Sequence, residues 1–532
     1  MAEKGINIQE VSINAVWNWV FFIISTISNI ILNILYTNLL GPTLYGEYKI
    51  VLMIFSIVYF ISNLISSLAI IKYASSIENQ KTGLVKDYVK VSFIFLLVIK
   101  SIIYLLYYFL SQQLLGNLYN PQIIWYSKIY FIYLLIEPLN YIFLAYNISI
   151  YKIKRTLIIS SLIPLLSLVF SIIYFFYIEI SVISLIISIL LANFIVALIW
   201  IYILVKEKIL TNFKSSDFKI LKQLILYSLP FYISGAIFLI NDWIDVFVIS
   251  VSLTTNAEYY TGIYSVARST YILVLGLMDS VIATLAPAFV NLYKRKNIDD
   301  LQDSIDKSTK YVLILSIFLS SIFIMISPML FQVIYPAYGE SVLILQIFLI
   351  DLPIVSLGRM FSQLISASNR KTLYKSLQVS IIQAISSIIT IFMFMYYLKL
   401  GILGAVISIS ISKIVGTLVT ILFVRREMNI KLKLKFFIKP LIVGLMLSIV
   451  FLLIIYPFEF FIIFENFSLI NQCIVLLLFG GSYILLFSLI LILFKTFNSY
   501  DYKNLKTFSK RNKILYVLAK PLIYLIGKFK ND

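Results

Sequence analysis

Three polar residues interrupt an otherwise apolar stretch near the middle of the chain, and two of them are negatively charged. The stretch reads IFLINDWIDVFVISV, from Ile237 to Val251, and its polar residues are Asn241, Asp242 and Asp245. An aspartate at the centre of a membrane helix costs about 2.5–3.5 kcal/mol on insertion scales. Carboxylates kept there at such a cost could bind a proton or a sodium ion, or neutralise a nearby cation.

Other ionisable residues also lie in apolar surroundings. The chain places five bases and five acids inside its predicted membrane spans, namely Lys49, Lys100, Arg268, Arg359, Lys413, Glu137, Asp242, Asp245, Asp279 and Asp351. Each could simply pair with another and hold two helices together. For Arg268 and Lys100 we expect contact with an anionic headgroup, because both lie deep in their spans and a guanidinium binds phosphate with two hydrogen bonds.

Two embedded bases and two embedded acids have simpler interpretations. Lys49 and Arg359 lie near the ends of their spans, where a long side chain can reach the membrane surface. Glu137 precedes Pro138, and Asp351 lies two residues before Pro353. Proline kinks a helix, so these carboxylates could mark hinges that bind a coupling ion or balance charge, although a structural bend explains the pattern equally well.

The composition predicts helices that cross a membrane. Of the 532 residues, 61% are hydrophobic and only 13% are charged, and apolar runs of about 20 residues recur from end to end. We therefore expect an all-α polytopic membrane protein with about 14 transmembrane helices. The predicted spans lie near 12–39, 46–71, 88–111, 122–148, 156–178, 181–204, 222–250, 257–290, 308–333, 340–366, 373–397, 401–424, 438–464 and 469–494.

The loops between these spans alternate in charge. Most of the 43 lysines and arginines fall on one side, and the exceptions are Lys49, Lys100, Lys128, Arg268, Arg359, Lys399 and Lys413. By the positive-inside rule both termini face the cytoplasm, which predicts a multi-pass protein of the cytoplasmic membrane. The net charge of +19 then describes a solvated cytoplasmic face and not a nucleic-acid partner.

The chain repeats itself at a distance of 216 residues. The matches are Arg155-Thr156-Leu157 with Lys371-Thr372-Leu373, Gly46 with Gly262, and Tyr48 with Tyr264. Six spans therefore occur twice in parallel, and two more follow. This divides the chain into an N-lobe (1–205), a C-lobe (206–437), a two-span addition (438–495) and a basic amphipathic cytoplasmic tail (496–532).

A polar stripe is copied with the repeat. The first span carries Asn18, Ser25, Asn29 and Asn33 on one helical face, and the seventh carries Ser234, Asn241 and Asp245 at the positions equivalent to 18, 25 and 29. The simplest physical reason for two such stripes is that both helices line one wet cavity. We therefore expect Asn29, Asn33 and Asn241 to contact the substrate there.

Several classes of protein are disfavoured. The chain has no histidine and one cysteine, Cys473, so neither a metal site nor a cofactor is predicted. It lacks the glycine-rich loop of nucleotide-driven pumps. Its predicted outer loops are short, whereas membrane glycosyltransferases and polymerases need room there for catalytic groups, so we do not expect an enzyme.

At these residues the chain resembles a known family. The segments NLLGPTLYGEYKI and GIYSVARS, with the plan of six, six and two spans, resemble polysaccharide-biosynthesis (oligosaccharide) flippases. These belong to the multidrug/oligosaccharidyl-lipid/polysaccharide exporter superfamily, have a MATE-like fold and are similar to lipid II flippases. The resemblance implies that a polyprenyl-(pyro)phosphate-linked oligosaccharide crosses the membrane by alternating access. It also implies membrane lipids, H⁺ or Na⁺, and glycan-assembly enzymes as partners.

Two other functions stay open. A cation-coupled multidrug exporter of the same fold would use Asp242 and Asp245 as coupling carboxylates and would carry an organic cation. An integral-membrane glycosyltransferase or polymerase would need catalytic groups in a large outer loop, and the sequence predicts none.

Overall fold

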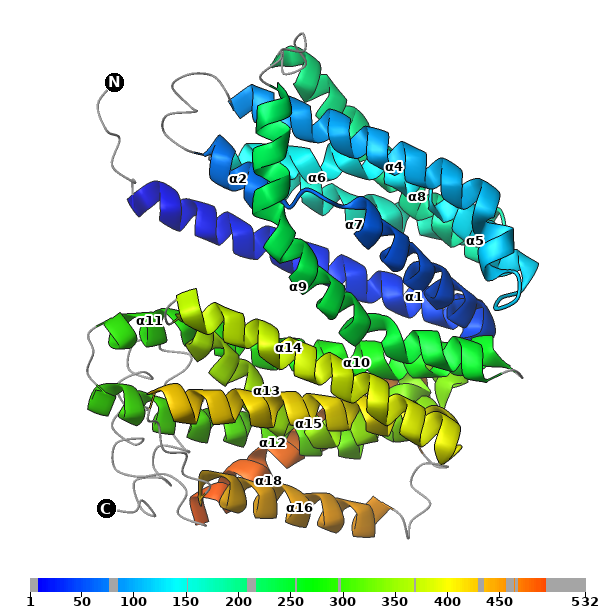
Figure 1. Cartoon of the computed structure of the whole chain (residues 1–532). Coiled ribbons are helices and arrows are strands. Elements are labelled where there is room, and N and C mark those ends of the chain that lie inside the picture. Colours follow the sequence, from blue (N-terminus) through cyan, green and yellow to red (C-terminus); the bar gives the residue numbers. More distant parts are fainter. Residues whose placement is uncertain are drawn as a thin grey trace. The chain divides into compact units, whose positions relative to one another are not determined.

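The computed structural model describes residues 8–75, 85–150, 152–207, 217–253, 256–294, 298–367, 370–428, 435–455, 464 and 467–493. In these ranges the chain forms helices and no strand (Figure 1). A helix satisfies all its backbone hydrogen bonds within one segment, as an apolar chain in lipid requires. The predicted all-α fold is therefore confirmed. The predicted tail, 496–532, lies outside the described residues.

The chain packs as two compact units, Met1–Ser265 and Val266–Asp532. The helices of the first unit are α1 (Ile8–Ser62), α2 (Ser67–Ala74), α4 (Val85–Leu115), α5 (Pro121–Tyr130), α6 (Tyr133–Ser149), α7 (Ile153–Tyr177), α8 (Val182–Lys206), α9 (Asp217–Ser252) and the start of α10 (Ala257–Ala283). A core that includes Ile70, Phe143 and Trp200 joins α2, α6 and α8. Because these side chains are almost fully buried, they fix the helices against one another.

The second unit continues from α10. Its further helices are α11 (Ala286–Lys294), α12 (Ile298–Ile334), the 3₁₀ turn η1 (Pro336–Tyr338), α13 (Ser341–Ala367), α14 (Arg370–Ile391), the π-helical η2 (Phe392–Tyr397), α15 (Gly401–Met428), α16 (Lys435–Ile455) and α18 (Leu469–Leu493). Met278, Phe361 and Val424 belong to a core between α10, α13 and α15. A separate cluster that includes Val443 and Tyr483 attaches α16 and α18 to α12.

Helix α1 bends sharply at Gly41 and so supplies two arms. Gly41 has φ 72° and is followed by Pro42, which cannot donate a backbone hydrogen bond. A straight helix of 55 residues would be about 80 Å long, far more than the ~30 Å core of a bilayer. Helix α1 is therefore long enough for two crossings, and the kink divides it into two arms.

Twelve stretches of the described residues are long and apolar enough to cross a membrane. The first of them, Ile24–Ala74, contains the kink, and α16 has a shorter apolar stretch, Ile438–Val450. The protein is thus a multi-pass membrane protein. The count of 14 spans and the cytoplasmic placement of the termini stay predictions.

Packing groups α9 with the first unit, whereas the repeat predicts a lobe boundary near residue 205. Tyr232 of α9 stacks on Phe60 of α1 with ring centroids 4.4 Å apart. The backbone N–H of Ser66 donates to Ser228 Oγ at 2.9 Å. The predicted lobe boundaries mark where the two copies of the sequence repeat begin and end, and they stay a prediction.

The glycines matched by the repeat lie where α1 and α10 touch. A Cβ on Gly46 would overlap the backbone carbonyl of Glu258, and one on Gly262 would overlap that of Pro42. The two helix backbones therefore approach more closely than any side chain allows. This close approach explains why both positions of the repeat carry glycine.

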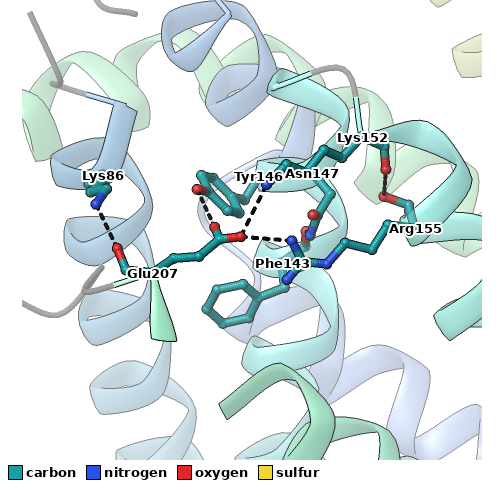
Figure 2. Close-up of polar contacts among 8 residues, drawn as sticks. Lys86, Phe143, Tyr146, Asn147, Lys152, Arg155 and Glu207 are labelled. Carbon is teal, nitrogen blue, oxygen red and sulfur yellow. Dashed lines mark hydrogen bonds and ion pairs between the residues drawn. The ribbon is translucent and has the colours of Figure 1, made fainter. Parts of the chain in front are cut away.

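Helix ends at one side of the first unit converge on Glu207, which follows α8 (Figure 2). Its carboxylate accepts hydrogen bonds from Tyr146 Oη at 2.7 Å, Arg155 Nη1 at 2.8 Å and Lys152 Nζ at 3.1 Å. Its backbone carbonyl accepts one from Lys86 Nζ at 2.6 Å. One residue thus ties α8 to α4, α6 and α7 on the side predicted to be cytoplasmic.

Burial alone would raise the pKa of the Glu207 carboxyl, but the hydrogen bonds from Arg155, Tyr146 and Lys152 outweigh it and lower the pKa to about 2. A lowered carboxyl pKa stabilises the fold above the unfolded value of about 4.3, and this contribution disappears as the pH falls toward 2. The Glu207 cluster therefore stabilises the first unit at neutral pH.

We expect Gly46→Ala and Gly262→Ala each to lower the melting temperature of the purified protein, because backbone atoms would have to move to admit the methyl group. The control is Gly276→Ala in α10, where no atom lies within 4 Å of a new Cβ. It should be neutral, or stabilise by about 0.5–1 kcal/mol through helix propensity. Equal changes in melting temperature for all three variants would contradict the close approach of α1 and α10 at Gly46 and Gly262.

Glu207→Gln should destabilise the protein by about 1 kcal/mol at pH 7, because Arg155 and Lys152 lose their carboxylate. Melting temperatures measured from pH 7 to pH 3 should show this difference narrowing below about pH 4.3, where the carboxyl of the unfolded chain takes up a proton. Glu427→Gln, which removes an ion pair with Lys375 at a more exposed place, is the matched control and should change stability less. If the difference in melting temperature between the wild type and Glu207→Gln grew as the pH fell, the stabilising role of the Glu207 carboxylate would be refuted.

Candidate functional site

The first unit contains an open cavity of about 470 Å³, lined by both polar and apolar side chains. Its walls come from both arms of α1, from α7 and from α8, and the lining residues are Ser25, Asn29, Leu32, Asn33, Tyr36, Tyr45, Tyr48, Lys49, Leu52, Ser160, Ile163, Pro164, Ser167 and Ile189. Hydroxyl and amide groups dominate its polar surface. Such a lining can exchange hydrogen bonds with a ligand that carries many hydroxyls.

The stripe predicted on the first span contributes to this cavity. Ser25, Asn29 and Asn33 all line it, and Tyr45 Oη donates to Asn33 Oδ1 at 2.9 Å. Asn29 is exposed. The hydrogen bond joins the two arms of α1, so the stripe both lines the cavity and holds its walls together.

Lys49 is the basic residue that lines this cavity. Because it lies near the end of a predicted span, the sequence had suggested that its side chain reaches the membrane surface. Its ammonium lies 5.0 Å from the centre of the Tyr45 ring, a distance at which a cation and a ring attract each other. The sequence signal is the segment LYGEYKI, which places tyrosines four and one residues before the lysine. That spacing puts Tyr45 and Lys49 on one helical face.

Glu137 and Lys100 form an ion pair inside the first unit. The side chain of Lys100 is fully buried, and Glu137 is 4% exposed. Tyr59 Oη donates to Glu137 Oε1 at 2.8 Å, and the Lys100 ammonium lies 4.5 Å from the centre of the Tyr59 ring. The structure thus brings together two predicted site residues that the sequence had assigned to separate roles.

Asp351 lies in a comparable cluster in the second unit. It is 2% exposed, accepts a hydrogen bond from Tyr271 Oη at 2.5 Å and lies 3.9 Å from Lys413 Nζ. The Lys413 ammonium is 4.3 Å from the centre of the Tyr271 ring. Nearby, Arg359 pairs with Asp279 at a half-exposed place.

The residues of the opening stretch have different surroundings. Asp245 is fully buried and accepts hydrogen bonds from Tyr264 Oη and, at 2.7 Å, from the backbone N–H of Val246. Asn241 and Asp242 are half-buried on the same helix, α9. Arg268 is half-buried on α10 and belongs to the second unit, whereas Lys100 belongs to the first.

The carboxylates of these clusters are engaged by neighbouring side chains. Within the ranges that the structure describes, no three histidine, cysteine, aspartate or glutamate side chains lie close enough to hold a metal ion. Three buried carboxylates, those of Glu137, Asp245 and Asp351, each accept a hydrogen bond from a tyrosine. The cavity, in contrast, presents an exposed amide, that of Asn29.

The fold is that of known membrane transporters. A lipid II flippase, MurJ, in an inward closed conformation aligns with a TM-score of 0.68 and 20% identity over 89% of this chain and 98% of its own. An inward-facing MATE-family multidrug resistance transporter of the MOP superfamily aligns with a TM-score of 0.62 and 17% identity, covering 76% and 94%. Both identities are low, so these likenesses concern the fold.

A third similar structure is a MOP-superfamily transporter from Pyrococcus furiosus, whose binding pocket is described as having reverse polarity. It aligns with a TM-score of 0.56 and 16% identity over 79% of this chain and 95% of its own. No curated protein sequence is similar enough to count as a match. The predicted MATE-like fold is confirmed by all three structures.

The sequence also matches a family model, described as polysaccharide biosynthesis protein, over residues 13–293. The match covers more than half of the chain and includes both segments that suggested the resemblance. The predicted resemblance is therefore confirmed, and the chain belongs to the polysaccharide biosynthesis protein family.

Proposed function

We propose that this protein is a flippase that moves a polyprenyl-(pyro)phosphate-linked oligosaccharide across the cytoplasmic membrane for glycan assembly. The observation that carries the proposal is the cavity of the first unit, in which hydroxyl and amide groups surround one lysine. Sugar hydroxyls pair with the former, and a phosphate pairs with the ammonium of Lys49. Membership of a polysaccharide-biosynthesis family and a fold shared with a lipid II flippase support it.

The cavity has the size and composition of a sugar site. Small-molecule sites commonly have volumes of about 300–1,000 Å³, and this one has about 470 Å³. Asn29 and Asn33 contribute amide groups, and Tyr36, Tyr45 and Tyr48 contribute aromatic rings to its walls. The lipid chain would remain in the bilayer while the sugars cross, so the cavity needs to hold only part of the substrate.

The remaining predicted site residues take roles within the same proposal. Arg268 is still proposed to bind the headgroup. Lys100 is proposed mainly to balance the charge of Glu137, because its ammonium is buried against that carboxylate. Asn241, Asp242 and Asp245 on α9 are proposed for substrate contact and for binding H⁺ or Na⁺. Alternating access driven by an ion gradient or by the membrane potential would move the substrate.

A multidrug exporter is the second candidate, because MATE transporters share the fold. Such an exporter would carry an organic cation, and a cavity rich in tyrosine rings could bind one. The ammonium of Lys49 in the same cavity repels a cation, which favours the anionic lipid-linked sugar.

Lys49→Met should reduce flipping of a lipid-linked oligosaccharide in proteoliposomes by about tenfold, because the headgroup loses a cation inside the cavity. The measurement is the accessibility of the sugar to an external lectin after insertion of a labelled polyprenyl-pyrophosphate oligosaccharide. Lys49→Arg should retain most of the activity.

The matched control is Lys128→Met. Lys128 also lies 5.0 Å from a tyrosine ring, that of Tyr108, but it does not line the cavity. It should flip lipid like the wild type. If the wild type exported dyes, and if it flipped none of several lipid-linked glycans above the level of empty liposomes, the flippase proposal would be wrong. The multidrug exporter would then be the supported function.

A further inference from the structure

Each compact unit buries one carboxylate that is shared by a tyrosine and a lysine. In the first unit, Glu137 accepts a hydrogen bond from Tyr59 and an ion pair from Lys100. The Lys100 ammonium also lies 4.5 Å from the Tyr59 ring centre and 6.0 Å from that of Tyr141. The cation is thus held by the carboxylate and by ring faces at the same time.

The second unit contains the same three kinds of group. Asp351 accepts a hydrogen bond from Tyr271, and its other carboxylate oxygen, Oδ2, lies 3.9 Å from Lys413 Nζ. The Lys413 ammonium lies 4.3 Å from the Tyr271 ring centre and 5.0 Å from that of Phe348. Carboxylate, phenol and ammonium therefore come together in both units, although Lys100 is fully buried and hydrogen-bonds Glu137, whereas Lys413 is partly exposed and lies farther from Asp351.

The sequence repeat accounts for only part of this likeness. Glu137 on α6 and Asp351 on α13 each lie shortly before a proline. The two acidic positions nearly coincide when the chain is shifted by 216 residues. The lysines do not coincide, because Lys100 lies on α4 and falls opposite Ser316, whereas Lys413 lies on α15 and falls opposite Ala197. The feature common to both units is an ammonium at the carboxylate and not a lysine at one position.

A buried carboxylate needs a cation or a proton to offset its lost hydration. A carboxylate and a phenol oxygen in an apolar unit could serve a sodium ion, since hard cations prefer oxygen ligands. Here a tethered ammonium already lies at each carboxylate. Two helices that are not equivalent supply it, which indicates that the requirement is a positive charge at that place.

We propose that Lys100 and Lys413 are built-in cations that occupy the carboxylate sites of Glu137 and Asp351 in place of an inorganic ion. Neither site then takes up Na⁺ in the wild-type protein. A coupling ion, where the protein uses one, then binds outside these two clusters. This inference concerns ion binding and stands whether or not the protein flips a lipid-linked sugar.

The test is the melting temperature of the purified full-length protein in detergent, in NaCl and in N-methyl-D-glucamine chloride at equal ionic strength. Lys413→Met and Lys100→Met should melt lower than the wild type in N-methyl-D-glucamine and should gain a Na⁺-dependent rise of about 3 °C, because a bare carboxylate then binds the ion. Lys413→Arg keeps a cation and should respond to Na⁺ as the wild type does.

Double variants separate ion binding from a general loss of stability. Lys413→Met with Asp351→Asn, and Lys100→Met with Glu137→Gln, replace each ion pair by neutral groups, so both should fold and show no added response to Na⁺. Single lysine variants that fold and gain no Na⁺ response would overturn the proposal.

The wild-type sites can also be tested without removing a lysine. Any Na⁺ response of the wild type should persist in Asp351→Asn and in Glu137→Gln, because neither carboxylate binds the ion while its lysine is present. A response of the wild type that disappears in either variant would show that Na⁺ binds there despite the lysine. This comparison remains decisive if the single lysine variants do not fold, and it measures no transport.

Discussion

A lysine and a carboxylate buried in the same apolar unit depend on each other to remain charged. Removing either ion from water costs several kcal/mol, and only a close partner offsets this cost. Lys100 with Glu137 satisfies this condition fully, and Lys413 with Asp351 satisfies it in part, because Lys413 is partly exposed. Helices α4 and α6, and likewise α13 and α15, are therefore tied together, because separating either pair would leave an isolated charge in apolar surroundings.

Tyrosine makes this arrangement possible, because one side chain offers a hydroxyl to a carboxylate and a ring face to a cation. Tyr59 and Tyr271 do both in their clusters. Tyr45 does something similar at the cavity, where its hydroxyl contacts Asn33 and its ring faces Lys49. The carboxylates of Glu137 and Asp351 are thus each offset by a lysine of the same unit, whereas Lys49 lines the cavity.

The sequence predicted the features that follow from periodicity. Apolar runs gave the helical membrane fold, and the 216-residue repeat matched Gly46 with Gly262, where the helices cross. The partners of the buried charges could not be predicted, because Lys100 and Lys413 come from helices that the repeat does not equate. Which side chains meet across helices depends on packing in three dimensions, and spacing along one chain does not encode it.

The kink at Gly41 has a mechanical consequence for the cavity. Asn29 and Lys49 lie on opposite arms of one continuous chain segment, so the angle between the arms sets the distance between two walls. Asn29 is 12 residues from the kink, about 18 Å along a helix, so a rotation of about 10° there would displace it by about 3 Å. The hydrogen bond from Tyr45 to Asn33 joins the same two arms, so the width of the chamber depends on the kink angle and on this contact together.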